Sequence, residues 1–216
     1  MREYGHISPR VRENLVQTLK KQGIKDLRVL EAIRNTPRHK FVDEALQHRA
    51  YDNDALPIGN GQTISQPYIV ARMTEALLAG NKPGRVLEVG TGSGYQAAVL
   101  SRLVKEVYSI ERISKMLPLV KAKFAEINIK NVKFKHGDGN QGWVEHAPFD
   151  AIMVTAAAAG VPTKLYEQLK MGGRIIIPIG MESEVQDLVE VVKTASGHQY
   201  KFLDKVRFVP MRSGNI

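Results

Sequence analysis

Three glycines at alternate positions, Gly90, Gly92 and Gly94, follow a short apolar run, and an alanine-rich segment with helical spacing comes directly after them. A buried strand, a glycine turn and a helix in this order form the nucleotide site of many open α/β sheets. Glycine suits such a turn because a side chain would keep the ligand away from the backbone. The segment therefore predicts a nucleotide-like ligand along Gly90–Gly94, with Thr91 and Ser93 also in contact.

Acidic residues stand at the ends of three successive predicted strands. Glu88 comes just before the glycine turn, and Glu111 ends the next strand. Asp138 follows the third strand, between Gly137 and Gly139. An acid in the position of Glu111 can accept hydrogen bonds from both hydroxyls of a ribose. Asp138 is placed to accept a hydrogen bond from an adenine amino group.

The Gly-x-Gly-x-Gly spacing and these acids resemble the class I methyltransferases that bind S-adenosylmethionine. The resemblance implies this cofactor, its product S-adenosylhomocysteine, and no metal. The cofactor has no phosphate, so a helix N-terminus is of less use than in NAD enzymes. Its sulfonium and ammonium groups suit an acid such as Glu88. The resemblance also assigns cofactor contacts to the glycine turn, to Glu111 with Arg112, and to Gly137–Gly139.

Strands and helices are expected to alternate regularly after a helix that begins at Pro67. The predicted strands lie at 85–89, 105–110, 131–136, 150–154 and 174–179, and helices at 94–103, 115–127 and 162–169 fit between them. The runs at 150–154 and 175–177 lack polar alternation, as strands buried on both faces do. Two strands at 185–193 and 202–209 follow without a helix, which predicts an antiparallel hairpin. These elements predict an α/β fold with a doubly wound, mostly parallel seven-stranded sheet, the Rossmann-like methyltransferase fold.

The first part of the chain has a different pattern. Residues 1–66 are predicted to be a helical N-terminal extension with a substrate loop, and residues 67–216 the cofactor-binding core of the same single domain. The elements expected in the extension are two helices that begin at Ser8 and Asp26, a short helical piece at 41–47, and a loop at 51–61.

A second motif, Gly61–Pro67 (Gly-Gln-Thr-Ile-Ser-Gln-Pro), gives a more specific resemblance. Together with the glycine turn it resembles the protein-L-isoaspartate O-methyltransferase family. Further matches, which extend the resemblance from about Arg10 to Met211, are Gly137–Gly139, Asp150–Ala157, Val161-Pro162, Gly172–Gly180 and Val206–Pro210. The chain departs from the pattern at Ala158–Gly160, where bacterial-type members often have Pro-Pro. This difference concerns the rigidity of the loop and not the reaction.

The resemblance implies transfer of a methyl group to the α-carboxylate of L-isoaspartyl residues in damaged proteins and peptides. The ester then closes to a succinimide, which reopens partly as aspartate. A carboxylate with a pKa of about 4 is already ionised at neutral pH, so the reaction needs no general base. We expect catalysis to come from alignment, worth roughly 7–11 kcal/mol in well-oriented reactions, and from removal of water. The resemblance assigns Ser65 to catalysis and to substrate binding. It assigns Gln62, Thr63 and Ile64 to cofactor binding, and Val209 and Pro210 to substrate binding.

Ser65 also has a purely structural interpretation. A serine shortly before Pro67 and an apolar helix is typical of a helix N-cap. The two roles are compatible, because the backbone can start the helix while the hydroxyl group faces the substrate.

Composition limits the remaining possibilities. The chain has 216 residues, of which 43% are hydrophobic, and no cysteine, so it can form one well-buried domain without disulfides or thiolate metal sites. Its six histidines are scattered, which predicts no metal site. No secretory signal or membrane-spanning stretch is evident, and we expect a cytoplasmic monomer without a membrane partner.

The formal net charge of +9 leaves a nucleic-acid methyltransferase as the main alternative. The basic residues, however, are interleaved with acids, and no basic block contains aromatic side chains. The Asn/Asp-Pro-Pro-aromatic tetrapeptide of amino-methylating enzymes is also missing. A binding module without turnover and an NAD oxidoreductase are further alternatives, and the glycine spacing argues against the latter. We therefore expect no nucleic-acid partner.

Overall fold

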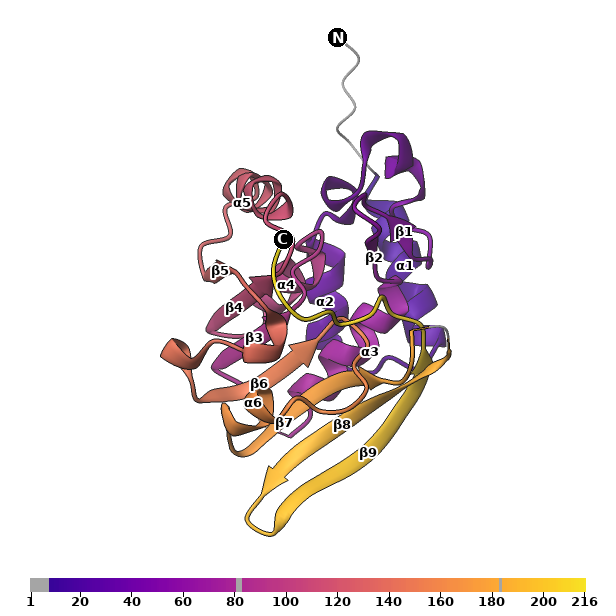
Figure 1. Cartoon of the computed structure of the whole chain (residues 1–216). Helices are drawn as coiled ribbons and strands as arrows, with labels where there is room; N and C mark the ends of the chain where they lie inside the picture. Colours follow the sequence, from indigo (N-terminus) through magenta and orange to yellow (C-terminus); the bar gives the residue numbers. More distant parts are fainter. Residues whose placement is uncertain (1–7, 81–82, 183) are drawn as a thin grey trace.

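A seven-stranded sheet in the order β5-β4-β3-β6-β7-β8-β9 forms the centre of the molecule (Figure 1). The computed structural model describes residues 8–80, 83–182 and 184–216. The pairings from β5 across to β7 are parallel, and those that add β8 and β9 are antiparallel. The prediction of an α/β, mostly parallel sheet with an antiparallel C-terminal hairpin is confirmed.

The elements have the following bounds. The strands of the large sheet are β3 (Arg85–Val89), β4 (Glu106–Glu111), β5 (Val132–His136), β6 (Phe149–Val154), β7 (Leu169–Ile179), β8 (Gln186–Thr194) and β9 (Gly197–Val206). The helices are α1 (Pro9–Lys21), α2 (Leu27–Asn35), α3 (Pro67–Leu78), α4 (Tyr95–Ser101), α5 (Met116–Glu126) and α6 (Thr163–Glu167). Four 3₁₀ turns are η1 (Arg38–Phe41), η2 (Glu44–Arg49), η3 (Gly139–Gln141) and η4 (Val144–His146), and a small hairpin is formed by β1 (Leu56–Pro57) and β2 (Thr63–Ile64).

Both faces of the central strands are covered, which explains their continuous apolar sequences. Successive side chains of a strand point to opposite faces, and Val86 and Leu87 accordingly belong to different hydrophobic clusters. The cluster of Val86 includes Leu19 and Leu77, so the N-terminal helices and α3 lie on that face. The cluster of Leu87 includes Leu165 of α6. No helix within the described residues is long and apolar enough to cross a lipid bilayer.

The two N-terminal helices begin where the sequence predicts. The Ser8 hydroxyl group accepts a hydrogen bond of 3.3 Å from the Arg10 backbone N–H at the start of α1. The Asp26 carboxylate accepts one of 2.9 Å from the Arg28 backbone N–H at the start of α2. These side chains satisfy N–H groups that have no partner within the helix.

The C-terminal hairpin differs from its prediction in position. The last strand is Gly197–Val206, whereas the sequence predicts 202–209. Its first half is polar and exposed, and a strand at the edge of a sheet does not need apolar residues to pair through its backbone. After Val206 the chain leaves the ladder, where the Phe208 backbone N–H donates to the Gln186 side chain.

Three further elements were placed inaccurately by sequence. The single helical piece expected at 41–47 is two 3₁₀ turns, η1 and η2, and the expected loop at 51–61 contains strand β1. Strand β7 begins at Leu169, ahead of the predicted 174, because Gly173 fits closely against its neighbour strand rather than forming a turn. A Cβ atom at Gly173 would lie 2.8 Å from the Asp150 carbonyl oxygen.

Gly94 provides a test of how α4 packs on α5. Its φ is +87°, and a Cβ atom there would lie 2.7 Å from Val120 and 2.9 Å from Phe124. Gly172 is a matched control, because its φ is +76° but nothing lies within 4 Å of its Cβ position. We predict that Gly94→Ala lowers the free energy of unfolding by about 1–3 kcal/mol more than Gly172→Ala, measured by urea denaturation. Equal losses would mean that only backbone strain matters at Gly94.

Candidate active site

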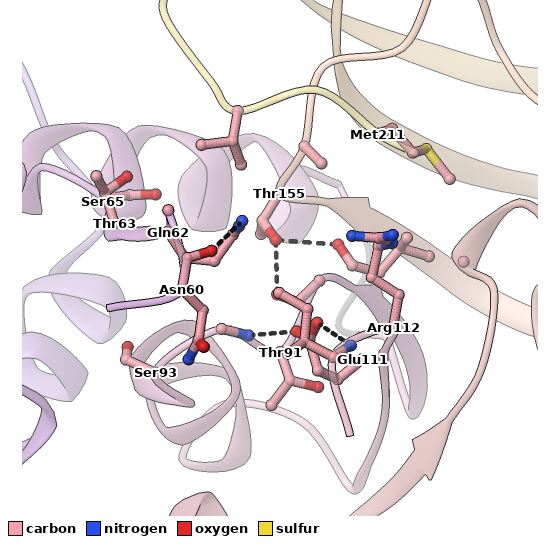
Figure 2. Close-up of a pocket in the computed structure, with 18 of the residues that line it drawn as sticks. Asn60, Gln62, Thr63, Ser65, Thr91, Ser93, Glu111, Arg112, Thr155 and Met211 are labelled. Carbon is pink, nitrogen blue, oxygen red and sulfur yellow. Dashed lines mark hydrogen bonds between the residues drawn. The ribbon is translucent and has the colours of Figure 1, made fainter. Parts of the chain in front are cut away.

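A cavity of about 670 Å³ lies at the carboxyl ends of β3, β4 and β6. The chain winds outward from β3 to β5 on one side and returns to β6 and β7 on the other, so this is the point where the strand order reverses. Such a point leaves a crevice in which open α/β sheets bind ligands. Figure 2 shows Thr63 and Ser65 on one side of the cavity and Glu111 and Arg112 on the other.

The glycine turn forms the floor of this cavity. A Cβ atom at Gly90 would lie only 2.5 Å from the Thr155 hydroxyl oxygen, so a larger residue would push the turn and β6 apart. Gly92 has a φ of +53°, and its Cβ position has nothing closer than a side-chain atom of Ile58 at 3.8 Å. The turn is therefore closely packed below and open above, where a ligand can approach its backbone.

Glu111 is fixed by the backbone beside this turn. One carboxylate oxygen accepts a hydrogen bond of 2.9 Å from the Gly92 backbone N–H, and the other accepts one of 2.9 Å from the Ile113 backbone N–H. Each carboxylate oxygen can accept a second hydrogen bond. Because Glu111 also lines the cavity, its carboxylate leaves acceptor capacity at the cavity wall.

Glu88 lies under the turn and does not line the cavity. Its side chain is fully buried, and it accepts a hydrogen bond from the Ser109 hydroxyl group, which in turn lies 2.6 Å from the Thr91 hydroxyl oxygen. Burial raises the pKa of the Glu88 carboxyl group to about 8, so it is largely neutral at pH 7. The geometry therefore does not support a direct contact between the Glu88 carboxylate and a positively charged ligand. Glu88 is instead linked to the cavity wall through the hydroxyl groups of Ser109 and Thr91.

Asp138 also lies just outside the cavity wall. Its carboxylate accepts hydrogen bonds of 2.8 Å from the backbone N–H groups of Asn140 and Gly214. Partial burial opposes ionisation, but these donors outweigh it and hold the pKa of Asp138 below its usual value. Gly137 is likewise not part of the wall, whereas Gly139 is.

The C-terminal segment crosses the carboxyl ends of the strands (Figure 1, yellow). The Ala157 backbone N–H donates to the Val209 carbonyl oxygen, and the Met211 N–H donates back to the Ala157 carbonyl oxygen. Further along, the Ile216 N–H donates to the Arg112 carbonyl oxygen at 2.7 Å. Val209 and Pro210, the predicted substrate residues, line the cavity on this side.

Ser65 lies between β2 and α3, where a second cavity begins. This second cavity, of about 420 Å³, shares Thr63, Ser65, Thr155 and Val209 with the first. The N-cap of α3 is Gln66, which makes no side-chain capping bond. The N-cap interpretation of Ser65 is therefore wrong, and the Asn53 side chain instead accepts a hydrogen bond from the Tyr68 backbone N–H.

The structure thus brings most of the predicted site residues together. Those that line the first cavity are Gln62, Thr63, Ile64, Ser65, Gly90, Thr91, Gly92, Ser93, Glu111, Arg112, Gly139, Val209 and Pro210. Those that do not are Glu88, Gly94, Gly137 and Asp138. In the part of the chain that the structure describes, no group of three or more His, Cys, Asp or Glu side chains is arranged to hold a metal ion.

Sequence reasoning missed several contributors to the wall, among them Thr155 and the last residues of the chain. Thr155 follows β6, and its hydroxyl group lies 3.0 and 2.7 Å from the carbonyl oxygens of Val89 and Gly90. The C-terminal residues Arg212 and Ile216 also line the cavity. The position of Thr155 directly after a buried strand was a usable signal, because ligands bind at such strand ends. Nothing in the sequence of the last residues pointed to the site.

Comparison with known proteins agrees with this geometry. The profile of the protein-L-isoaspartate(D-aspartate) O-methyltransferase family matches residues 10–215. Protein-L-isoaspartate O-methyltransferases of Pseudomonas paraeruginosa and Methylobacillus flagellatus are 54% identical over 209 residues and 55% identical over 212 residues. Each match covers 97% of this chain, and 99% and 95% of those proteins, respectively.

Two solved structures extend the comparison. A protein-L-isoaspartate O-methyltransferase structure superposes with a TM-score of 0.84 at 35% identity, covering 92% of this chain and 65% of that one. A Plasmodium falciparum structure described as such an enzyme, in complex with S-adenosyl-L-homocysteine, gives 0.77 at 27% identity, covering 93% and 98%. This chain therefore belongs to the protein-L-isoaspartate(D-aspartate) O-methyltransferase family.

Proposed function

We propose that the chain repairs damaged proteins by transferring the methyl group of S-adenosylmethionine to the α-carboxylate of L-isoaspartyl residues, and that transfer takes place beside Ser65. The observation that carries this proposal is the position of Ser65 at the junction of two cavities. The first cavity contains the features that suit the cofactor, and the second opens toward the C-terminal strand, where a peptide can lie.

The first cavity fits S-adenosylmethionine in size and in polar groups. Its volume is within the range of about 300–1,000 Å³ found for small-molecule sites. We propose that Glu111 accepts hydrogen bonds from the ribose hydroxyl groups and that the cofactor rests on the open side of Gly92. When bound, the cofactor supplies an electrophilic methyl group on a positively charged sulfur. The related structure that contains S-adenosyl-L-homocysteine supports the choice of ligand.

The protein residues have to orient a nucleophile that is already ionised. We propose that the Ser65 hydroxyl group donates a hydrogen bond to one oxygen of the substrate carboxylate, so that the other oxygen points into the first cavity. Val209 and Pro210 would form the opposite wall for the peptide backbone. Thr155 lines both cavities at their junction, beside the position proposed for the nucleophile.

The overall organisation agrees with a single methyltransferase domain. One hydrophobic cluster joins Leu19 of α1 and Ile33 of α2 to Val86 and Met153 of the sheet, which supports residues 1–66 as an extension of the core at 67–216. A monomeric state, a cytoplasmic location and the lack of nucleic-acid and membrane partners remain predictions from the sequence.

The reaction can be tested with paired peptides that differ only in an isoaspartyl or aspartyl linkage. With labelled S-adenosylmethionine, we predict a base-labile methyl ester on the isoaspartyl peptide alone, because only the isoaspartyl linkage leaves the α-carboxylate free, whereas in the aspartyl peptide that carboxyl group is part of the peptide bond. Equal labelling of both peptides, or of neither, would contradict the proposal. Labelling of DNA or RNA in a parallel sample would favour the nucleic-acid alternative.

Ser65→Ala tests the placement of the active site. Loss of one hydrogen bond to a charged group costs about 1.5–3 kcal/mol, so we predict a fall in kcat of roughly 10–100-fold. The melting temperature should be unchanged because Ser65 is not the helix cap. Ser101→Ala is a control at the end of α4, where the hydroxyl group donates only to the Ala98 carbonyl oxygen. A normal kcat in Ser65→Ala would refute the role.

Glu111→Gln tests the cofactor half of the site. The amide has one acceptor oxygen in place of two, so we predict that the Kd for S-adenosylmethionine rises roughly 10–100-fold, measured by calorimetry. Glu106→Gln is the matched control, because Glu106 lies at the other end of the same strand and pairs on the surface with Lys133. Equal affinities of the two variants would tell against a ribose contact at Glu111.

A further inference from the structure

Arg38 is a buried positive charge that has no negatively charged partner among the described residues. Its side chain is 0% exposed, and within the described residues neither Nε nor Nη1 has a hydrogen-bond partner. None of the ion pairs formed within the described chain includes it. Burial lowers the pKa of Arg38 to about 10, so the group is still charged at pH 7. A buried charge without a partner opposes folding, which directs attention to what Arg38 contacts.

The first contact of Arg38 is with the segment that leads to the predicted catalytic residue. Its Nη2 donates a hydrogen bond of 3.2 Å to the Asp54 carbonyl oxygen. Strand β1 begins two residues later and pairs with β2, so that Leu56 lies opposite Ile64. Ser65 follows directly. Arg38 therefore fixes the base of the hairpin whose second strand ends at Ile64, directly before Ser65.

Asn53, the residue before Asp54, ties the same segment to the start of helix α3. The Gln66 side chain donates a hydrogen bond of 2.7 Å to the Asn53 carbonyl oxygen, and the Asn53 side chain accepts one of 2.9 Å from the Tyr68 backbone N–H. Residues 53 and 54 are thus held by Gln66 from one side and by Arg38 from the other. Ser65 lies inside the closed loop that these bonds form.

The second contact of Arg38 is with the cofactor half of the site. The guanidinium carbon lies 4.8 Å from the centre of the Tyr95 ring, a distance suited to a cation–π interaction. Tyr95 is the first residue of α4, directly after Gly94, and it lines the first cavity. Its ring is held from another direction by Phe41, whose ring centre lies 5.6 Å away.

We propose that Arg38 is a positioning residue for methyl transfer, which fixes the distance between Ser65 and the glycine turn by joining the Asp54 carbonyl group to the Tyr95 ring. The inference rests on the proposed roles of Ser65 and the first cavity. The proposed mechanism relies on alignment of an ionised nucleophile, and a displacement of about 1 Å can lower a rate by roughly 100-fold. Arg38 is well suited to the task because its planar guanidinium can stack and donate at the same time.

The test compares Arg38→Met with the wild-type enzyme. We expect kcat for an isoaspartyl peptide to fall between tenfold and about 100-fold, while the affinity for S-adenosylmethionine is little changed, since the hydrogen bonds that hold Glu111 come from the Gly92 and Ile113 N–H groups and not from Arg38. The melting temperature should stay the same or rise, because replacing an unpaired buried charge with an apolar side chain is often neutral or stabilising. Arg38→Lys keeps the charge and a donor and should recover part of the loss in kcat.

Arg34→Met is the matched control. Arg34 is a half-buried residue of α2 that pairs with Glu13 of α1 and with Glu31, and this variant should keep a normal kcat. A normal kcat in folded Arg38→Met would overturn the inference. So would a joint fall of kcat, cofactor affinity and melting temperature, which would indicate a purely structural role.

A second variant keeps the test decisive if Arg38→Met does not fold. Gln66→Met removes another tie to the segment, the bond to the Asn53 carbonyl oxygen, from a half-buried position. It should show the same fall in kcat with little change in cofactor affinity, and a normal kcat would count against the inference.

The wild-type enzyme separates the two proposals. If it does not methylate the peptide, the proposed function fails. If it does and the variants match it, only the role of Arg38 fails.

Discussion

The end of strand β3 is held by hydrogen bonds from both neighbouring strands, and the cofactor half of the site depends on this constraint. The Gly90 backbone N–H donates to the Ile110 carbonyl oxygen of β4, while the Thr155 N–H donates to the Val89 carbonyl oxygen, each at 2.9 Å. The glycine turn therefore has no freedom to move toward the sheet. Its open side faces the crevice at the reversal of strand order, so the close packing below the turn leaves the surface above it accessible to a ligand.

The rest of the site comes from segments far from β3 in the sequence. The hairpin that leads to Ser65 belongs to the N-terminal extension, and Val209 belongs to the chain after the last strand. Residues of both segments line the two cavities together with Thr155. This assembly suits a reaction whose nucleophile is ionised in advance, because the protein then has to supply alignment and exclusion of water rather than a proton acceptor.

Two buried ionisable side chains connect these parts without lining either cavity. Glu88 is linked through Ser109 to Thr91 on the cofactor side. Arg38 contacts the Asp54 carbonyl group and the Tyr95 ring, and so joins the extension to the glycine turn. Both are costly groups to bury. Their positions agree with a site in which rigidity of the wall matters more than the number of groups that touch the ligand.

The sequence by itself determined the order of the strands and helices, the glycine turn and the segment around Ser65. These depend on local patterns: apolar runs, alternate glycines and a distinctive short motif. Only the tertiary structure decided which acids reach the cavity. Glu111 does and Glu88 does not, because the direction of a strand-end side chain depends on its neighbours in the sheet. Likewise, the tertiary structure placed the polar first half of β9 in the sheet and brought Arg212 and Ile216 to the site, since edge pairing and long-range backbone bonds leave no local signal in the sequence.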